Sequence, residues 1–357
     1  IGEEGYTNAS PFCSDGPRLD EFLAEMRREV FEGREGYMNV GEAPGITPER
    51  NEFITNPAHK ELDMLFLFDH VSIDQSPESK WDTHAFVPKK LQDRMSRQQE
   101  AVRNAGWASL FFCNHDQPRV VSRWGNDSDR ESRELSAKAF GMLLHMHRGT
   151  PYIYEGEELG MTNAHFTELG QYRDLEAINA YRQRVEEARC QSPESMMAAL
   201  ALIGRDNART PMQWDASRYA GFTPADAATE PWIGVNPNHV EINAAEEFDD
   251  PDSVYGFYKK LIAMRHNSAT VATGEWNLVA ADSEQVYAFT RTGGDDTILV
   301  VVNLTDESAG LPGEVAELLG DGVAESQILL STYDAVHSVK SIARGELARW
   351  EGVVIQL

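Results

Sequence analysis

Short apolar runs recur along the first half of the chain, and polar or charged residues follow each run. Four runs have this form: YMNV before Gly41 and Glu42, LFLF before Asp69 and His70, SLFFC before His115 and Asp116, and PYIY shortly before Glu157 and Glu158. Runs that are apolar at every position are typical of strands buried on both faces of a sheet. The pattern therefore predicts four strands whose C-terminal ends carry polar side chains.

The segments between these runs have the period of amphipathic helices. The first helical stripe consists of Leu19, Phe22, Leu23, Met26 and Val30. Gly33 follows this stripe as a helix stop, and Thr47 before Pro48 is typical of a helix N-cap. Further helical patterns cover residues 91–104 and 128–148. Alternating strands and helices predict a parallel sheet with helices outside it, and polar strand ends are the place where a (β/α)8 barrel builds its site.

The pattern changes to a period of two near residue 272, and QVYAFTRTGGDDTILVVVNL reads as a strand, a turn and a strand. We therefore predict an α/β fold, the C-terminal part of a (β/α)8 TIM barrel followed by an antiparallel β-sandwich domain. Residues 1–272 form the half barrel, with a helical excursion near 162–204. Residues 273–357 form the C-terminal β domain.

Composition and charge exclude several classes of partner. The 357 residues carry a net charge of −26, which argues against nucleic acid and against an anionic membrane surface. No apolar run is long enough to span a membrane. The three cysteines, Cys13, Cys113 and Cys190, are odd in number and widely spaced, so they indicate neither a disulfide framework nor a metal site. A reducing, cytoplasmic location is the expectation.

Two carboxylates, Glu42 and Asp116, stand at predicted strand ends that a barrel would bring to one face. Glycoside hydrolysis commonly needs such a pair of carboxyl groups. Each residue alone can equally be a turn or cap carboxylate, because polar strand ends are common. His115 has a structural alternative of the same kind. The three arginines of these loops can simply anchor them: Arg119, Arg205 and Arg209.

Five motifs in order make the chemistry specific. They are YMNVGEAPG, FFCNHDQPRVVSRWGND, HRGTPYIYEGEELGMTN, GRDNARTPMQWD and PWIGVNPNHVEIN with DPDSVYGFYKKLIAMR. Together they closely resemble the oligo-1,6-glucosidase and α-glucosidase branch of the α-amylase family (glycoside hydrolase family 13). The resemblance covers nearly the whole chain and is loose only in the β domain. It implies retaining hydrolysis of terminal α-glucosidic bonds of short oligosaccharides, without a redox cofactor.

The resemblance also implies roles for single residues. Glu42 matches the general acid/base, and Asp116 matches the carboxylate that stabilises the transition state. His115 matches the histidine that binds sugar in the −1 subsite, and Arg205 resembles the arginine that holds the non-reducing end. Glu155 stands where members usually carry glutamine. We expect this difference to alter local hydrogen bonding and not the class of reaction.

One family motif is missing. The nucleophile of the family is an aspartate in a GFRxD motif some tens of residues before the acid/base, and no FRxD occurs in the 357 residues. The chain starts at Ile1, and its opening residues resemble the inside of a domain. We expect a fragment of a longer α-glucosidase that is inactive alone. A half barrel exposes an apolar face, so we also expect the missing N-terminal half or a second copy to cover it.

Other members of the fold leave alternatives. A sucrose isomerase carries a distinctive charged loop after NHD, and the loop VVSRWGNDSDR is closer to that of hydrolases. A trehalose-6-phosphate hydrolase needs a phosphate-binding cluster that the sequence does not reveal. A transporter-associated, non-enzymatic relative would have lost the carboxylates and gained a membrane helix. The choice between α-1,6 and α-1,4 bonds, and any calcium site, depend on the missing N-terminal part.

Overall fold

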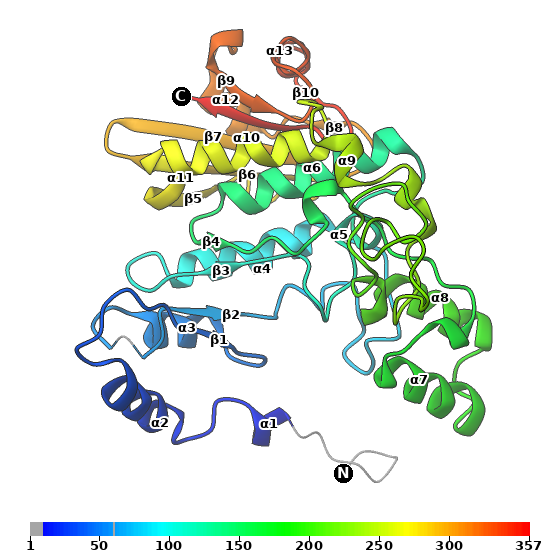
Figure 1. The fold of residues 1–357 in the computed structure, drawn as a ribbon. Coiled ribbons are helices and arrows are strands. Elements are labelled where there is room, and N and C mark those ends of the chain that lie inside the picture. The colour runs from blue at the N-terminus through cyan, green and yellow to red at the C-terminus, as the bar shows by residue number, and fades with distance from the viewer. Residues whose placement is uncertain (1–9, 60) are drawn as a thin grey trace.

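The computed structural model describes residues 10–59 and 61–357, and the predicted internal start at Ile1 lies outside this range. Figure 1 shows the elements in successive layers. An antiparallel sheet lies at the top, two long helices run below it, and the parallel strands with their helices follow further down. This order places the N-terminal helices and strands, drawn in blue, far from the C-terminal sheet.

Four short parallel strands form the predicted half barrel. They are β1 (Val40–Glu42), β2 (Met64–Phe66), β3 (Ser109–Leu110) and β4 (Thr150–Pro151). Strand β1 pairs with β2, and β3 pairs with β4, both in parallel. A parallel bridge between Leu65 and Ala108 joins the two pairs. The spatial order is therefore β1-β2-β3-β4, which confirms the predicted arrangement.

Helices connect these strands and cover one side of them. They are α1 (Ser10–Cys13), α2 (Leu19–Met26) continued by a π-helix (Arg27–Phe31), α3 (Pro48–Thr55), α4 (Pro88–Ala101), α5 (Val120–Arg123) and α6 (Arg130–Met146). The predicted cap of α3 is present, since the Thr47 hydroxyl accepts from the Arg50 N–H at 3.2 Å. Helix α6 begins after Asp129, whose carboxylate accepts from the Ser132 N–H at 2.9 Å. Local sequence thus determines where α3 and α6 begin.

Two predicted apolar features differ from expectation. The first helical stripe packs only in part: Leu19, Leu23 and Met26 lie against a small core. Phe22 on α2 is 52% exposed, and Val30 on the following π-helix is 43% exposed. The run Leu62–Phe68 was expected to be a strand buried on both faces, but only Met64–Phe66 pairs, and Phe66 and Phe68 are half-buried. Both phenylalanines line a cavity on the open side of the half barrel.

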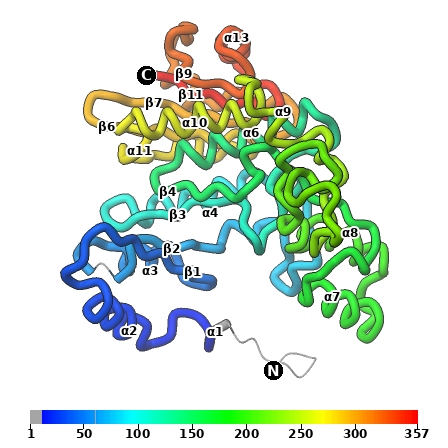
Figure 2. Tube along the Cα trace, in the orientation of Figure 1, coloured from blue at the N-terminus to red at the C-terminus, as the bar shows by residue number. Residues whose placement is uncertain are grey.

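A helical excursion follows β4. It contains α7 (Leu175–Tyr181), a π-helix (Arg182–Glu187) and α8 (Pro193–Ile203). Figure 2 shows their trace projecting at the lower right, away from the antiparallel sheet. The excursion has a small core of its own, which includes Tyr172, Met196 and Leu200. The chain then returns through a 3-10 turn (Arg205–Asn207), a 3-10 turn (Pro237–Val240), α9 (Ala244–Glu247), α10 (Val254–Asn267) and α11 (Ala269–Thr273).

The C-terminal part is the predicted antiparallel β structure. Five strands pair in the order β5 (Glu275–Val279), β6 (Val286–Gly293), β7 (Asp296–Asn303), β11 (Gly352–Gln356) and β9 (Ile328–Ser331). A second sheet pairs β8 (Ala309–Gly310) with β10 (Glu346–Leu347), and helices α12 (Gly313–Leu319) and α13 (Ala335–Ala343) lie beside it. Side chains of β6 alternate between two cores: Val286 and Ala288 face the β8/β10 side, whereas Tyr287 and Phe289 face the barrel helices.

Helix α6 joins the half barrel to this sheet. His147 follows the helix, and its Nε2 lies 2.9 Å from the Tyr287 hydroxyl of β6. Burial lowers the pKa of His147 to about 3, so the ring is neutral in the folded protein. His145, in the last turn of α6, is buried as well. In the described part of the chain, no helix has the length and apolar character needed to cross a bilayer.

Candidate active site

The C-terminal ends of β1 and β3 bring two predicted site residues to one cavity. Glu42 is the last residue of β1 and is exposed. His115 follows β3, and its side chain is 67% exposed. Both line a cavity of about 320 Å³ whose walls are largely aromatic. Phe66, Phe68, Phe111, Tyr152 and Tyr154 supply those aromatic walls.

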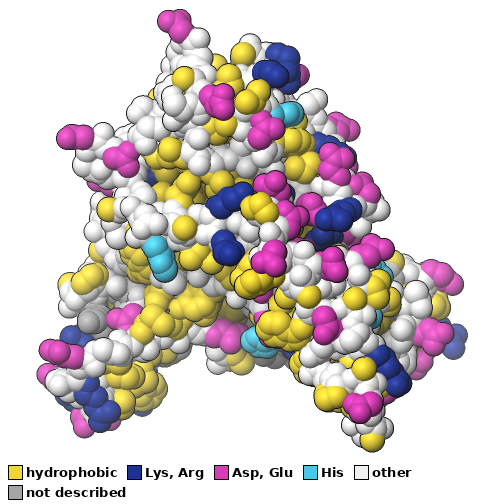
Figure 3. Space-filling view, turned by 45° about the horizontal axis from the view of Figure 1, so that its top comes forward, with side chains coloured by type: hydrophobic (Ala, Val, Ile, Leu, Met, Phe, Trp, Pro, Cys, Tyr) yellow, Lys and Arg dark blue, Asp and Glu magenta, His cyan; other side chains and the backbone are white. Residues whose placement is uncertain are grey.

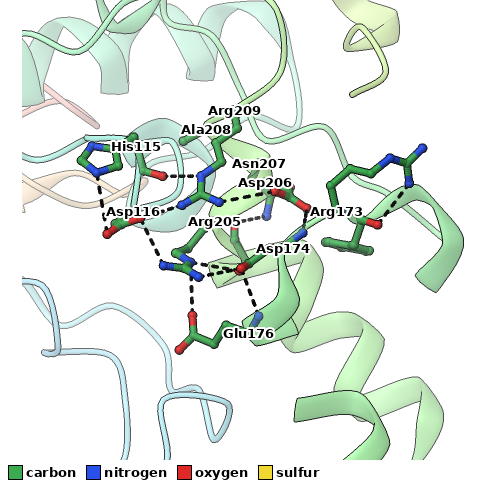
Figure 4. Close-up of polar contacts among 12 residues, drawn as sticks. His115, Asp116, Arg173, Asp174, Glu176, Arg205, Asp206, Asn207, Ala208 and Arg209 are labelled. Atoms are coloured by element: carbon green, nitrogen blue, oxygen red, sulfur yellow. Dashed lines mark hydrogen bonds and ion pairs between the residues drawn. The ribbon is translucent and has the colours of Figure 1, made fainter. Parts of the chain in front are cut away.

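Asp116 lies next to His115 in a tight turn. The side chain of Asn114 accepts from the Asp116 N–H at 2.7 Å, which closes this turn directly after the apolar run. The Asp116 carboxylate then meets two arginines, as Figure 4 shows. Its Oδ1 accepts from Arg209 Nη2 at 2.7 Å and from Arg205 Nη1 at 3.3 Å. Its Oδ2 lies 3.8 Å from His115 Nε2.

Arg205 connects this carboxylate to the helical excursion. Its Nε and Nη2 donate to the two oxygens of Asp174 at 2.9 and 2.6 Å, and Nε lies 3.3 Å from Glu176 Oε2. Burial alone would raise the pKa of Asp174, but the bidentate pair with Arg205 outweighs it and holds that pKa below its ordinary value. The same pair raises the pKa of Arg205. Arg205 is therefore held among three carboxylates, those of Asp116, Asp174 and Glu176.

Sequence reasoning missed Asp174, and it gave Arg209 only an anchoring role without its contact to Asp116. Arg209 makes the shorter contact to Asp116, and its Nε also donates to the His115 carbonyl at 2.8 Å. The four-residue spacing of the two arginines in GRDNART could have indicated a shared partner. The 3-10 turn Arg205–Asn207 brings both arginines to the Asp116 carboxylate. Buried Asp206 supports the turn by accepting from the N–H groups of Arg173 and Asp174 at 2.6 and 2.8 Å.

Two other polar residues near the strand ends, His70 and Glu157, lie away from the cavity. His70 is buried, its Nε2 lies 2.9 Å from the Phe111 carbonyl, and burial lowers its pKa to about 4. Glu157 is also buried and accepts from the Tyr258 hydroxyl of α10 at 3.2 Å. Both residues pack into the protein and are absent from the lining of the 320 Å³ cavity. The strand-end pattern therefore overestimated the number of residues available to a substrate.

Within residues 10–59 and 61–357, no group of three or more histidine, cysteine, aspartate or glutamate side chains is arranged to hold a metal ion. What the site offers is two carboxylates, a histidine and two arginines beside an aromatic cavity. Carboxyl groups with neighbouring cationic and aromatic groups suit binding and acid/base chemistry on a neutral polyhydroxylated substrate.

Comparison with known proteins agrees with this chemistry. Residues 2–274 match the α-amylase catalytic domain family. Over 354 residues the chain is 41% identical to the oligo-1,6-glucosidase of Parageobacillus thermoglucosidasius, covering 99% of this chain and 60% of that protein. The chain thus spans about three fifths of the length of such curated relatives.

Solved structures show the same relationship. The trehalose-6-phosphate hydrolase of Bacillus licheniformis superimposes with a TM-score of 0.87 at 38% identity, covering 99% of this chain and 61% of that one. The isomaltulose synthase of Klebsiella sp. LX3 superimposes with a TM-score of 0.84 at 31% identity, covering 96% and 59%. The fold of the described residues is therefore that of part of these larger enzymes.

Proposed function

Because the chain belongs to the α-amylase family of glycoside hydrolases, we propose that it is part of a retaining α-glucosidase. The substrates are the terminal α-glucosidic bonds, α-1,6 before α-1,4, of short oligosaccharides. The observation that carries this proposal is the cavity at the C-terminal strand ends that Glu42 and His115 share, with Asp116 beside it. Oligo-1,6-glucosidase relatives at about 40% identity support the choice of bond.

Each site residue has a proposed role. Glu42 is exposed to the cavity and donates a proton to the leaving oxygen, then accepts one from water. Asp116 stabilises the positive charge that develops on the sugar ring, and the two arginines keep its carboxylate in place. His115 binds sugar hydroxyls, and Arg205 orients the non-reducing end.

The domain division is also a proposal. Residues 1–272 contribute the half barrel with its excursion near 162–204, and residues 273–357 form the β domain. Helix α11 ends at Thr273 and strand β5 begins at Glu275, which supports a boundary there. The apolar cavity on the open side of the barrel strands supports a covering partner. We propose that a further N-terminal segment or a second copy of the chain covers this face.

Two neighbouring activities remain to be compared with hydrolysis. In the loop after NHD, Arg119 and Arg123 are buried, and Arg123 forms a buried bidentate pair with Asp74 at 2.7 Å. These two arginines therefore do not present their charge to a bound sugar, which favours a hydrolase over a sucrose isomerase. Sucrose and trehalose 6-phosphate belong in the assay as competing substrates.

The test begins with the intact mass and N-terminal sequence of the source protein. The 357-residue chain and any longer form are then assayed on isomaltose, maltose, sucrose and trehalose 6-phosphate, with product anomers followed by NMR. We expect glucose release with retained configuration from the longer form only. Glu42→Gln in that form should lower kcat roughly 100- to 10,000-fold. Hydrolysis by the 357-residue chain alone would require another nucleophile and a new assignment of the site.

A further inference from the structure

Arg119 is a buried cation that no carboxylate contacts directly within the described residues. The residue is 1% exposed, and no ion pair to a carboxylate is present for it within the described residues. A buried charge is normally paired, because desolvation is costly. Here Nη1 donates to the Glu155 carbonyl at 2.5 Å and Nη2 donates to the Ala208 carbonyl at 3.2 Å. The guanidinium thus bridges the main chains of two loops that follow different parts of the fold.

Tyr154 supports the same bridge from a second side. Its ring lies under the Arg119 guanidinium, with 5.0 Å between the guanidinium carbon and the ring centroid. Its hydroxyl donates to the Ala208 carbonyl at 3.1 Å. One main-chain oxygen therefore accepts hydrogen bonds from the buried Arg119 and the half-buried Tyr154, which restricts the position of Ala208.

Ala208 directly precedes Arg209, the residue that holds Asp116. Arg209 Nη2 donates to Asp116 Oδ1 at 2.7 Å and Nε donates to the His115 carbonyl at 2.8 Å. A displacement of Ala208 would move the start of the Arg209 side chain and lengthen both contacts. The path from Arg119 to Asp116 therefore consists of one covalent step and two hydrogen bonds.

We propose that Arg119, together with Tyr154, is a positioning residue that orients Arg209 and through it the Asp116 carboxylate. Its planar guanidinium directs five N–H donors along fixed directions and so reaches two separate carbonyls, whereas lysine carries its three donors on a single nitrogen. The inference rests on the role proposed above for Asp116. The contacts of Arg209 can be measured without an activity assay. Failure of this inference is therefore distinguishable from failure of the proposed activity.

Arg291 provides a matched control in the same chain. It is a buried arginine that also donates to main-chain carbonyls, to Gly274 at 2.9 Å and to Met146 at 2.6 Å. It lies on β6 at the interface between the antiparallel sheet and α6. Arg291→Met should destabilise the protein as Arg119→Met does, but it should leave the loop of Arg209 unchanged.

The experiment measures solvent exchange of the Arg209 Nε–H by NMR of the 357-residue chain, with Arg209→Lys identifying the signal. We expect a protected signal that exchanges about tenfold faster in Arg119→Met, the change that corresponds to losing one ordinary hydrogen bond. Arg119→Lys and Tyr154→Phe should give smaller increases in the same direction. Arg291→Met should give none.

Three results would overturn the proposal. The first is an unprotected Arg209 signal in the unmodified chain. The second is unchanged exchange in a folded Arg119→Met, and the third is an equal increase in Arg291→Met. If Arg119→Met does not fold, Tyr154→Phe decides, because it removes only the hydroxyl that contacts Ala208.

Discussion

Glu157 illustrates how burial changes the chemistry of a single residue. Burial raises its pKa to about 7, although Tyr258 donates a hydrogen bond to it. The pKa of Glu157 is thus higher in the folded protein than its unfolded value near 4.5. The protonated carboxyl therefore stabilises the folded protein fully below pH 4.5, and this stabilisation is lost as pH rises through 7. This loss is on the order of 3 kcal/mol.

Replacing Glu157 by glutamine should therefore reduce the fall in unfolding free energy between pH 5 and pH 8, because the amide stays neutral. Urea unfolding at both pH values measures the change. Glu317→Gln, an exposed position on α12, should leave the pH dependence as it is. If Glu157→Gln loses stability with pH as steeply as the unmodified chain, the carboxyl is ionised in the fold and the inference fails.

Single residues were predictable from the sequence only where local pattern decides their place. Glu42, His115 and Asp116 follow apolar runs, and the structure places them at the ends of β1 and β3. Their chemical roles came from the motifs. Asp174 gave no such signal, because its contact with Arg205 joins segments that are distant in sequence. Local pattern carries no information on which charged side chains meet.

The N-cap of α3 shows what can be tested for a single element. Thr47 accepts from the Arg50 N–H, and Pro48 occupies the first helical position. Thr47→Ala removes the hydroxyl acceptor and should lower the unfolding free energy by about 1 kcal/mol. Thr47→Ser keeps the acceptor and should cost much less. Urea unfolding of both variants measures this difference, and equal losses would show that the cap contributes little.

Elements were predicted well in order and less well in extent. The run LFLF indicates burial, and Leu67 is indeed buried, but it lies outside the paired residues of β2. Apolar character reports contact with other apolar groups, whereas strand length depends on pairing partners. The same reason applies to α2, whose stripe has the correct period although Phe22 remains exposed. Period alone cannot reveal whether another element covers a helix.

The arrangement of the whole molecule depends on the periodicity of each segment and on contacts between segments that are distant in sequence. Alternating strands and helices predicted the parallel half barrel, and the period of two predicted the antiparallel sheet, because each period reflects how side chains point from the backbone. The packing of α6 and its C-terminal residue His147 against the antiparallel sheet was not predictable, since it requires knowledge of which buried faces meet. It contains the contact of His147 with Tyr287.

The open face of the half barrel leads to a prediction for the whole molecule. Figure 3 shows hydrophobic side chains gathered around a hollow on one side of the protein. The half-buried Phe66 and Phe68 line the cavity on the open side, and accessible apolar surfaces of this kind mark association sites. We therefore expect the 357-residue chain alone to associate with itself at micromolar concentrations.

Phe68→Glu places a charge on this face and should shift sedimentation velocity profiles toward the monomer, because association would bury the new carboxylate. Leu318→Glu is the matched control, since Leu318 is 46% exposed on α12 beside the β8/β10 sheet, a different part of the molecule. It should leave the profile unchanged. A chain that stays monomeric without any substitution would show that the open face needs no cover. If both substitutions shift the profile equally, the open face is not the association site. The shift toward the monomer would then come from added repulsion between chains that already carry a net charge of −26.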